Sequence, residues 1–232
     1  RCLRRLEVGL SGKLSSFELM WGDFYAHLTQ AQLPQRPRPM ALGHAFYALV
    51  EAMGGDEASD DAQFERHLAM LVDDGLVVDA VIAQSGRERD ALWAVREDLS
   101  PGFTPLRPFL SYDVSMGLRD MPAFAQMARA NVVAAFPEAI LLFYGHAGDG
   151  NLHAVISIGC MDAAIALAID TAIYDAVRQV GGSIAAEHGV GTTRAGFLPW
   201  TRTPNEIALM RRLKAALDPA GILNPGKILL PE

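Results

Sequence analysis

Cysteine is nearly absent from this sequence: only Cys2 and Cys160 occur among its 232 residues. Two thiols are too few for a disulfide framework or for a zinc site built from cysteines, and such sparse use fits a reducing compartment. Long apolar runs are missing as well. The longest, such as AILLFYG, fall far short of the roughly 20 residues that a membrane-spanning helix needs. The sequence therefore predicts neither a disulfide-rich fold nor a transmembrane helix.

Basic charge is also scarce. Twenty lysine and arginine residues stand against 27 aspartate and glutamate residues, for a net charge of -7 at pH 7, and no basic block interrupts this balance. A surface of this kind repels phosphate groups, so we expect no nucleic-acid partner. The few cysteines, which fit a reducing compartment, indicate a cytoplasmic protein.

The beginning of the chain lacks both an initiator methionine and the apolar core of a signal peptide. It opens with a helical pattern, which suggests a piece of a longer protein. Internal repeats and Gly/Ser linkers are missing too, while half of the residues are hydrophobic. We therefore expect a substantial core rather than a tethered or disordered chain.

What is present is an alternation of strand and helix patterns. The second half predicts strands at FLSYDVSM, AILLFYGHA, LHAVISIG and GSIAAEHGVG, with helices at MPAFAQMARANVVAAF and MDAAIALAIDTAIYDAVRQV. This β-α-β-β-α-β order is the ferredoxin-like arrangement. The first half offers a looser version, with strands at SSFELMW and HAFYALVEAMG, a β-branched run at LVVDAVIAQ, and helices at DAQFERHLAMLVDDG and RERDALWAVRED.

These patterns predict an α+β fold of duplicated ferredoxin-like lobes, with an extended antiparallel sheet and helices on one face. Lobe one would span about 1–100 and lobe two about 101–200, with a C-terminal helix and tail over 201–232.

The stretch YGHAGDGNLH contains two histidines, an aspartate and an asparagine within ten residues. Asp149-Gly150 between two apolar runs predicts a hairpin with a two-residue type I′ turn. That turn would place His146 directly opposite His153, with their Cβ atoms about 5 Å apart on one face. Two imidazoles at this spacing suit one cation. The alternative is a polar hairpin with incidental histidines.

A third ligand is available in AAEHGVG, where Glu187 precedes His188. Two imidazoles and one carboxylate form a known type of catalytic divalent-metal site. Adjacent residues point to opposite sides of an ideal strand, but Gly189 and Gly191 would allow a kink that brings both to one pocket. The alternatives are a solvated carboxylate and a surface imidazole.

The motifs GHAGDGNLH, AAEHGVG and LDPAGILNPGK, in this order, resemble the C-terminal (cap) domain of FAD-linked oxidases of the vanillyl-alcohol-oxidase superfamily. The most similar branch contains D-lactate dehydrogenase, the glycolate oxidase flavoprotein subunit and D-2-hydroxyglutarate dehydrogenase. The resemblance covers essentially the whole chain. It implies the substrate- and metal-binding domain of an FAD-dependent 2-hydroxy-acid dehydrogenase, with hydride passing from C2 of a D-2-hydroxy acid to the flavin.

The resemblance also implies roles for individual residues. His146, His153 and Glu187 would bind zinc or manganese, and His188 would be the general base. Arg96 would hold the substrate carboxylate, with Ser100 on the same wall. Asn151 would lie near the metal, substrate and flavin, and Asn224 near the flavin.

Partners follow from the same resemblance. FAD would be held mainly by an N-terminal domain absent from this chain, so the isolated domain should be inactive. Electrons would pass to an electron-transfer flavoprotein, a quinone or a cytochrome. Contact with such an acceptor is the way in which the protein could be associated with a membrane surface. A homodimer is also compatible with the sequence.

One position departs from the hydroxyglutarate branch, where a lysine precedes the YD of FLSYDVSM and helps to bind the distal carboxylate. Here that position is Ser111. We therefore expect a smaller or different 2-hydroxy acid rather than a five-carbon diacid. Two other classes remain open on the sequence alone: a stand-alone metal-dependent hydrolase and a non-catalytic scaffold.

Overall fold

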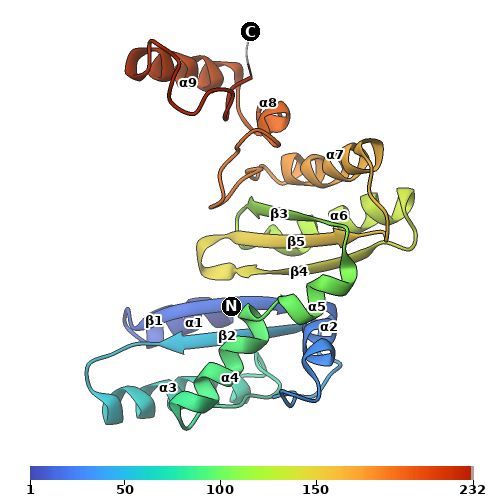
Figure 1. The fold of residues 1–232 in the computed structure, drawn as a ribbon. Coiled ribbons are helices and arrows are strands. Elements are labelled where there is room, and N and C mark those ends of the chain that lie inside the picture. The colour runs from blue at the N-terminus through green and yellow to red at the C-terminus, as the bar shows by residue number, and fades with distance from the viewer. Residues whose placement is uncertain (231–232) are drawn as a thin grey trace. The chain divides into compact units, whose positions relative to one another are not determined.

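The computed structural model describes residues 1–230 (Figure 1). The chain forms two compact units. Unit 1 comprises 1–107 and 142–149, and unit 2 comprises 108–141 and the chain from Gly150 onward. Among residues 1–230, no helix combines the length and apolar character needed to cross a bilayer.

Unit 1 combines strands with helices of widely different lengths. Its helices are α1 (Cys2–Gly9), α2 (Gly22–Gln32), α3 (Glu57–Asp73), α4 (Gly86–Glu97), α5 (Ser100–Phe103) and the 3-10 turn η1 (Thr104–Leu106); its strands are β1 (Leu14–Trp21), β2 (Phe46–Ala52) and most of β4 (Ile140–His146). Leu6 and Leu10 bury themselves against Leu71, so α1 and α3 share one core. Ser85 caps α4 by accepting a hydrogen bond from the Glu88 backbone N–H, as expected for a helix start.

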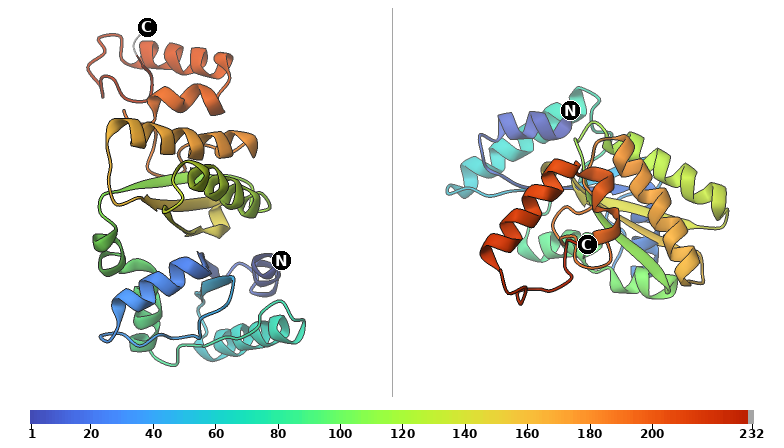
Figure 2. Two further views of the ribbon diagram at one scale, coloured as in Figure 1. Left: turned by 90° about the vertical axis from the view of Figure 1, so that its right-hand side faces the viewer. Right: turned by 90° about the horizontal axis from the view of Figure 1, so that it is seen from above.

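Unit 2 packs two long helices beside each other, α6 and α7 (Figure 2). Its elements are β3 (Phe109–Ser115), α6 (Met121–Ala135), β5 (Asn151–Ser157), α7 (Ala163–Gln179), η3 (Ala195–Phe197), α8 (Leu198–Thr201) and α9 (Pro204–Leu217). Tyr112 of β3 meets Tyr174 of α7 edge to face, with ring centroids 5.5 Å apart. Every residue of β5 is buried, so this strand is covered on both faces.

The strand order β2-β1-β4-β5-β3 confirms an α+β fold with a five-stranded antiparallel sheet. The predicted sequence β-α-β-β-α is confirmed over β3, α6, β4, β5 and α7. Duplicated ferredoxin-like lobes are not observed, because residues 1–107 contribute two strands where that arrangement has four. The helix α2 was missed, although Phe24, Tyr25 and Leu28 form its buried face.

Within the described residues, one predicted strand is wrong and one β-branched run forms no strand. The run LVVDAVIAQ has no regular secondary structure: Leu76 and Val77 pack partly against the core of α1 and α3, whereas Val78 and Val81 are exposed. The segment GSIAAEHGVG forms only one bridge, Ser115 with Ser183, along the edge of β3. After Ser183 the segment forms no regular ladder: the Ala186 N–H donates to the Asp113 backbone oxygen, and the Glu187 and His188 N–H groups donate to the Asp113 side chain.

The turn between β4 and β5 differs from its prediction. β4 ends at His146 and β5 begins at Asn151, so the four residues 147–150 connect them through a short 3-10 turn, η2 (Ala147–Asp149). The two-residue type I′ turn is wrong, and with it the basis for placing His146 directly opposite His153.

Gly150 is required by this turn. Its φ is +71°, and a Cβ atom added to it would lie 2.6 Å from the Met116 backbone oxygen. We expect Gly150→Ala to lower the free energy of unfolding by about 1–3 kcal/mol, measured by urea denaturation. Gly148→Ala is the matched control, because nothing lies within 4 Å of its added Cβ. Equal stability of the two variants would contradict this account.

Candidate functional site

His146 lies opposite a carboxylate in unit 1. The register of β1 with β4 pairs Glu18 with His146, and the His146 Nδ1 lies 2.8 Å from Glu18 Oε1. Glu18 is only 4% exposed. Because a cross-strand pair shares one face of the sheet, the carboxylate fixes the rotation of the imidazole. Nδ1 is thus engaged, so Nε2 is the nitrogen that would bind a cation.

Arg96 completes this buried cluster from the last turn of α4. Its Nη2 lies 3.1 Å from Glu18 Oε2, and its guanidinium lies over the Tyr144 ring at 4.5 Å. Arg96 is 6% exposed. A buried carboxylate without a counter-charge would be costly, so Arg96 offsets the desolvation of Glu18. Arg96 Nε has no hydrogen-bond partner among the described residues, which leaves one buried donor for another acceptor.

His153 lies opposite a second carboxylate, in unit 2. The register of β3 with β5 pairs Asp113 with His153, and His153 Nδ1 lies 3.9 Å from Asp113 Oδ1. Asn151 shares this face, two residues along β5, and pairs with Ser115. Asn151 is 4% exposed, and its Oδ1 has no hydrogen-bond partner among the described residues.

Residues 183–188 run along the free edge of β3. Ser183 and Ser115 exchange backbone hydrogen bonds of 2.7 and 3.1 Å, and the Ala186 N–H donates to the Asp113 backbone oxygen at 3.2 Å. The next two backbone N–H groups, of Glu187 and His188, both donate to Asp113 Oδ2, at 3.0 and 2.7 Å. Asp113 therefore holds this segment with its backbone and its side chain.

The same contacts set the charge of Asp113. Burial by itself raises the pKa of this carboxyl, but the hydrogen bonds from His188 and Glu187 and the two neighbouring imidazoles outweigh burial and lower the pKa below its usual value. Asp113 therefore stays ionised at neutral pH, in the state that accepts hydrogen bonds best.

Three predicted residues gather beside Asp113. His153 Nε2 lies 3.5 Å from Glu187 Oε1, and His188 Nε2 lies 3.7 Å from the same oxygen. The His153 and His188 rings are stacked, with centroids 5.8 Å apart. His188 is more than half exposed, which leaves its ring accessible. Gly189 and Gly191 follow with φ of +73° and +59°, so the chain bends there.

The remaining predicted residues lie elsewhere. Ser100 begins α5 in unit 1 with an exposed side chain. Asn224 lies in the C-terminal tail of unit 2 at φ +48° and is exposed. The sequence pattern assigned no role to Glu18 or Asp113. The available signal was the same for both: a carboxylate flanked directly by apolar or aromatic residues within a predicted strand.

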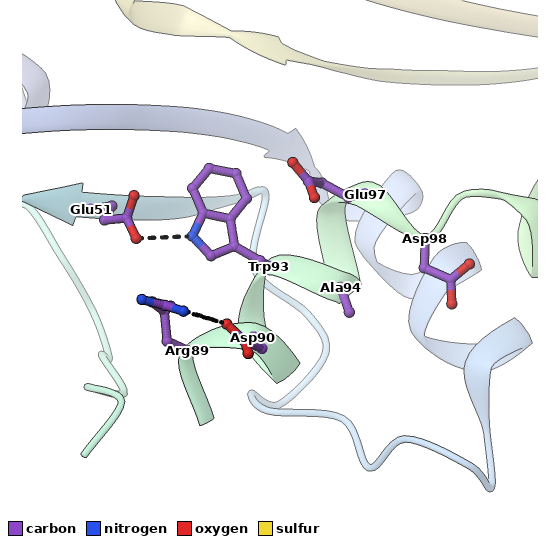
Figure 3. A pocket seen from close by; sticks show the side chains of 7 residues that line it. All are labelled: Glu51, Arg89, Asp90, Trp93, Ala94, Glu97 and Asp98. Carbon is purple, nitrogen blue, oxygen red and sulfur yellow. Dashed lines mark hydrogen bonds and ion pairs between the residues drawn. The ribbon is translucent and has the colours of Figure 1, made fainter. Parts of the chain in front are cut away.

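A separate cavity of about 600 Å³ lies between β2 and α4 in unit 1 (Figure 3). The Trp93 indole N–H donates to Glu51 Oε1 at 3.3 Å, and Arg89 pairs with Asp90 at 2.8 Å. Its lining residues are Glu51, Arg89, Asp90, Trp93, Ala94, Glu97 and Asp98. None of these belongs to the predicted site, although Arg96 lies on the same helix.

Comparison with known proteins assigns the chain to one family. Residues 5–228 match the model of the FAD linked oxidases, C-terminal domain, and the chain belongs to this family.

Among curated relatives, the chain is 36% identical over 200 residues to a D-2-hydroxyglutarate dehydrogenase of Stutzerimonas stutzeri, covering 83% of this chain and 42% of that protein. It is 34% identical over 191 residues to the mitochondrial D-2-hydroxyglutarate dehydrogenase of Arabidopsis thaliana, covering 82% and 34%. It is 30% identical over 227 residues to a D-2-hydroxyglutarate–pyruvate transhydrogenase of Saccharomyces cerevisiae, covering 95% and 46%. The chain thus spans less than half of the length of each of these relatives.

Two solved structures share the fold. A 4-ethylphenol oxidase from Gulosibacter chungangensis superposes with a TM-score of 0.55 at 17% identity, over 94% of this chain and 48% of that one. An alkyldihydroxyacetonephosphate synthase gives a TM-score of 0.55 at 13% identity, over 96% and 41%. At these identities the likeness concerns the fold alone.

Proposed function

We propose that this chain is the substrate- and metal-binding domain of an FAD-dependent D-2-hydroxy-acid dehydrogenase. One observation carries the proposal beyond family membership: each predicted imidazole ligand lies opposite a buried carboxylate, Glu18 for His146 and Asp113 for His153. Histidines that bind metals characteristically turn their second ring nitrogen toward a carboxylate or carbonyl, which fixes the tautomer. Incidental histidines of a polar hairpin do not require buried acids.

The proposed ligands of one divalent cation are His146, His153 and Glu187, which form a candidate metal group by residue type. Two neutral imidazoles and one carboxylate leave coordination positions open for substrate. The His153–Glu187 contact supports this set within unit 2, and the Glu18–His146 hydrogen bond supports it within unit 1. Zinc and manganese both accept these ligands.

The chemistry of a 2-hydroxy acid explains why these groups are needed. A bound cation would stabilise the negative charge that develops on the substrate hydroxyl oxygen when its proton leaves. FAD, which we propose is held mainly by a separate domain, would accept the hydride from C2. The protein's own tasks are therefore to hold the carboxylate, to orient C2 and to remove the hydroxyl proton.

His188 is the proposed general base, because its ring is exposed and lies beside His153. Arg96 would hold the substrate carboxylate through the donors that Glu18 does not use. Asn151 would place its unpartnered amide oxygen toward the substrate or the flavin. Ser100 and Asn224 are proposed for the substrate wall and the flavin side, respectively.

Flavin reduction tests this function. In the FAD-containing enzyme to which we assign this chain, D-2-hydroxy acids should reduce the flavin under anaerobic conditions, and their L-enantiomers should not. Removal of the metal with a chelator should stop the reduction, and Zn²⁺ or Mn²⁺ should restore it. Hydrolysis of ester or phosphate substrates by the 232-residue chain without FAD would instead establish a metal-dependent hydrolase.

The substrate class depends on Ser111, which lies on β3 two residues before Asp113 with its side chain exposed. The relatives are named for D-2-hydroxyglutarate, whereas an uncharged serine cannot form an ion pair with a distal carboxylate. We expect Ser111→Lys to raise kcat/KM for D-2-hydroxyglutarate relative to D-lactate by about 5-fold, the effect of one exposed ion pair. Ser111→Gln is the uncharged control of similar length. A wild-type enzyme that already prefers D-2-hydroxyglutarate strongly would contradict the role assigned to Ser111.

A further inference from the structure

We propose that Asp113 is a positioning residue: its carboxylate fixes the backbone of Glu187 and His188 so that both side chains work on the same side of the chain. The roles of the two positioned side chains rest on the proposed function, in which Glu187 is a metal ligand and His188 is the general base. The hydrogen bonds themselves do not depend on that assignment.

The geometry explains how two adjacent residues serve one site. In a regular strand, successive backbone N–H groups point to opposite edges and successive side chains point to opposite faces. Here the N–H groups of Glu187 and His188 both donate to one oxygen, Asp113 Oδ2. The backbone must turn to allow this, and the turn brings both side chains toward His153.

The position of Asp113 along β3 supports a specific role. Aspartate is disfavoured inside strands, and this side chain is fully buried, with no exposed surface. Burying a carboxylate is costly unless it is paired and hydrogen-bonded. The two backbone donors satisfy Oδ2, and the His188 and His153 rings lie 3.6 and 3.9 Å from the carboxylate; Oδ1 accepts no hydrogen bond among the described residues. Asp113 acts on the backbone, so its negative charge does not replace that of Glu187.

Its neighbour Tyr112 shows the contrast. The Tyr112 hydroxyl points to the opposite face of β3 and donates to Asp170 Oδ1 of α7 at 2.7 Å. Asp170 is thus a half-buried acid of the same unit that bonds to a side chain of the core and to none of the predicted ligands. Asp170→Asn is therefore a matched control for Asp113→Asn.

Backbone hydrogen exchange of the 232-residue chain tests the positioning directly. In Asp113→Ala, we expect the amides of Glu187 and His188 to exchange at least 10-fold faster than in the wild type, as the loss of a charge-assisted bond predicts. Asp113→Asn keeps an oxygen acceptor, and we expect an increase of about 3-fold, because neutral bonds are roughly half as strong. Asp170→Asn should leave both amides unchanged.

Metal affinity tests the consequence. Titration of the chelator-treated chain with Zn²⁺ should show a loss of about 10–100-fold in Asp113→Ala, the range typical of residues that orient ligands. Asp113→Asn should recover part of this loss, and Asp170→Asn should bind as the wild type does. If the substitutions act only by lowering fold stability, Zn²⁺ binding should weaken equally in Asp113→Ala and Asp113→Asn. That result would overturn the proposal.

The two proposals fail separately. If the wild type binds no Zn²⁺ or Mn²⁺, the metal site is wrong, and the exchange of the Glu187 and His188 amides still decides the role of Asp113. If the wild type binds Zn²⁺ and Asp113→Ala binds it equally well, the positioning role is wrong and the metal site stands. If Asp113→Ala does not fold, unchanged amide exchange in Asp113→Asn overturns the proposal.

Discussion

Replacing His146 and His153 together by alanine is expected to lower the affinity of this chain for Zn²⁺ by more than 100-fold. Residues that only orient metal ligands typically contribute 10–100-fold, and the loss of two ligands should exceed that range. One carboxylate, Glu187, would remain, and a single exposed carboxylate does not hold a divalent ion tightly. Metal content after dialysis and titration calorimetry with Zn²⁺ measure the effect.

The control for this experiment is His67→Ala. His67 lies in α3, where its ring packs near Gly9, and it is not among the proposed ligands. That variant should bind Zn²⁺ as the wild type does. Full metal content in the double variant would show that the ion, if present, has other ligands, and the assignment would be abandoned.

The second large effect concerns His188. In the FAD-containing enzyme, His188→Ala should lower kcat for D-2-hydroxy-acid oxidation by about 10²–10⁴-fold, the usual contribution of a general base. Substrate would still bind through Arg96 and the metal, so KM should change little. Zn²⁺ affinity should also stay near that of the wild type, because His188 is not among the proposed ligands.

These readouts separate a base from a ligand. A His188→Ala variant that loses Zn²⁺ as well as activity would make His188 a fourth ligand rather than the base. Retained kcat would remove it from the chemistry altogether. His67→Ala again controls for the loss of an imidazole from the chain.

The hairpin of β4 and β5 shows which features the local sequence pattern predicts and which it does not. Two apolar runs around GDGN correctly predicted β4 and β5, since alternation and turn residues act over a few positions. The turn itself was wrong. Gly150 does adopt the left-handed conformation that the Asp-Gly pattern requires, but its contact with Met116, distant in sequence, accompanies a four-residue connection. Loop geometry thus depended on a neighbour that the local sequence does not specify.

The carboxylates illustrate the larger gap. Glu18 is 128 residues from His146, and Asp113 is 74 residues from Glu187. No spacing rule links such positions, because the strand register that pairs them is set by packing across the whole sheet. The irregular segment 183–188 was predicted as a strand for the same reason: its β-like composition was overridden by hydrogen bonds to Asp113.

The sequence by itself determined the candidate ligand types, the order of most strands and helices, and the resemblance that pointed to the FAD-linked oxidase family. Residue identity and short-range periodicity are properties of the chain, so they are available before folding. Only the tertiary structure decided which groups hold the imidazoles, why Glu187 and His188 share one side, and where Arg96 is buried. These depend on contacts between strands far apart in sequence, and such contacts exist only once the sheet has formed.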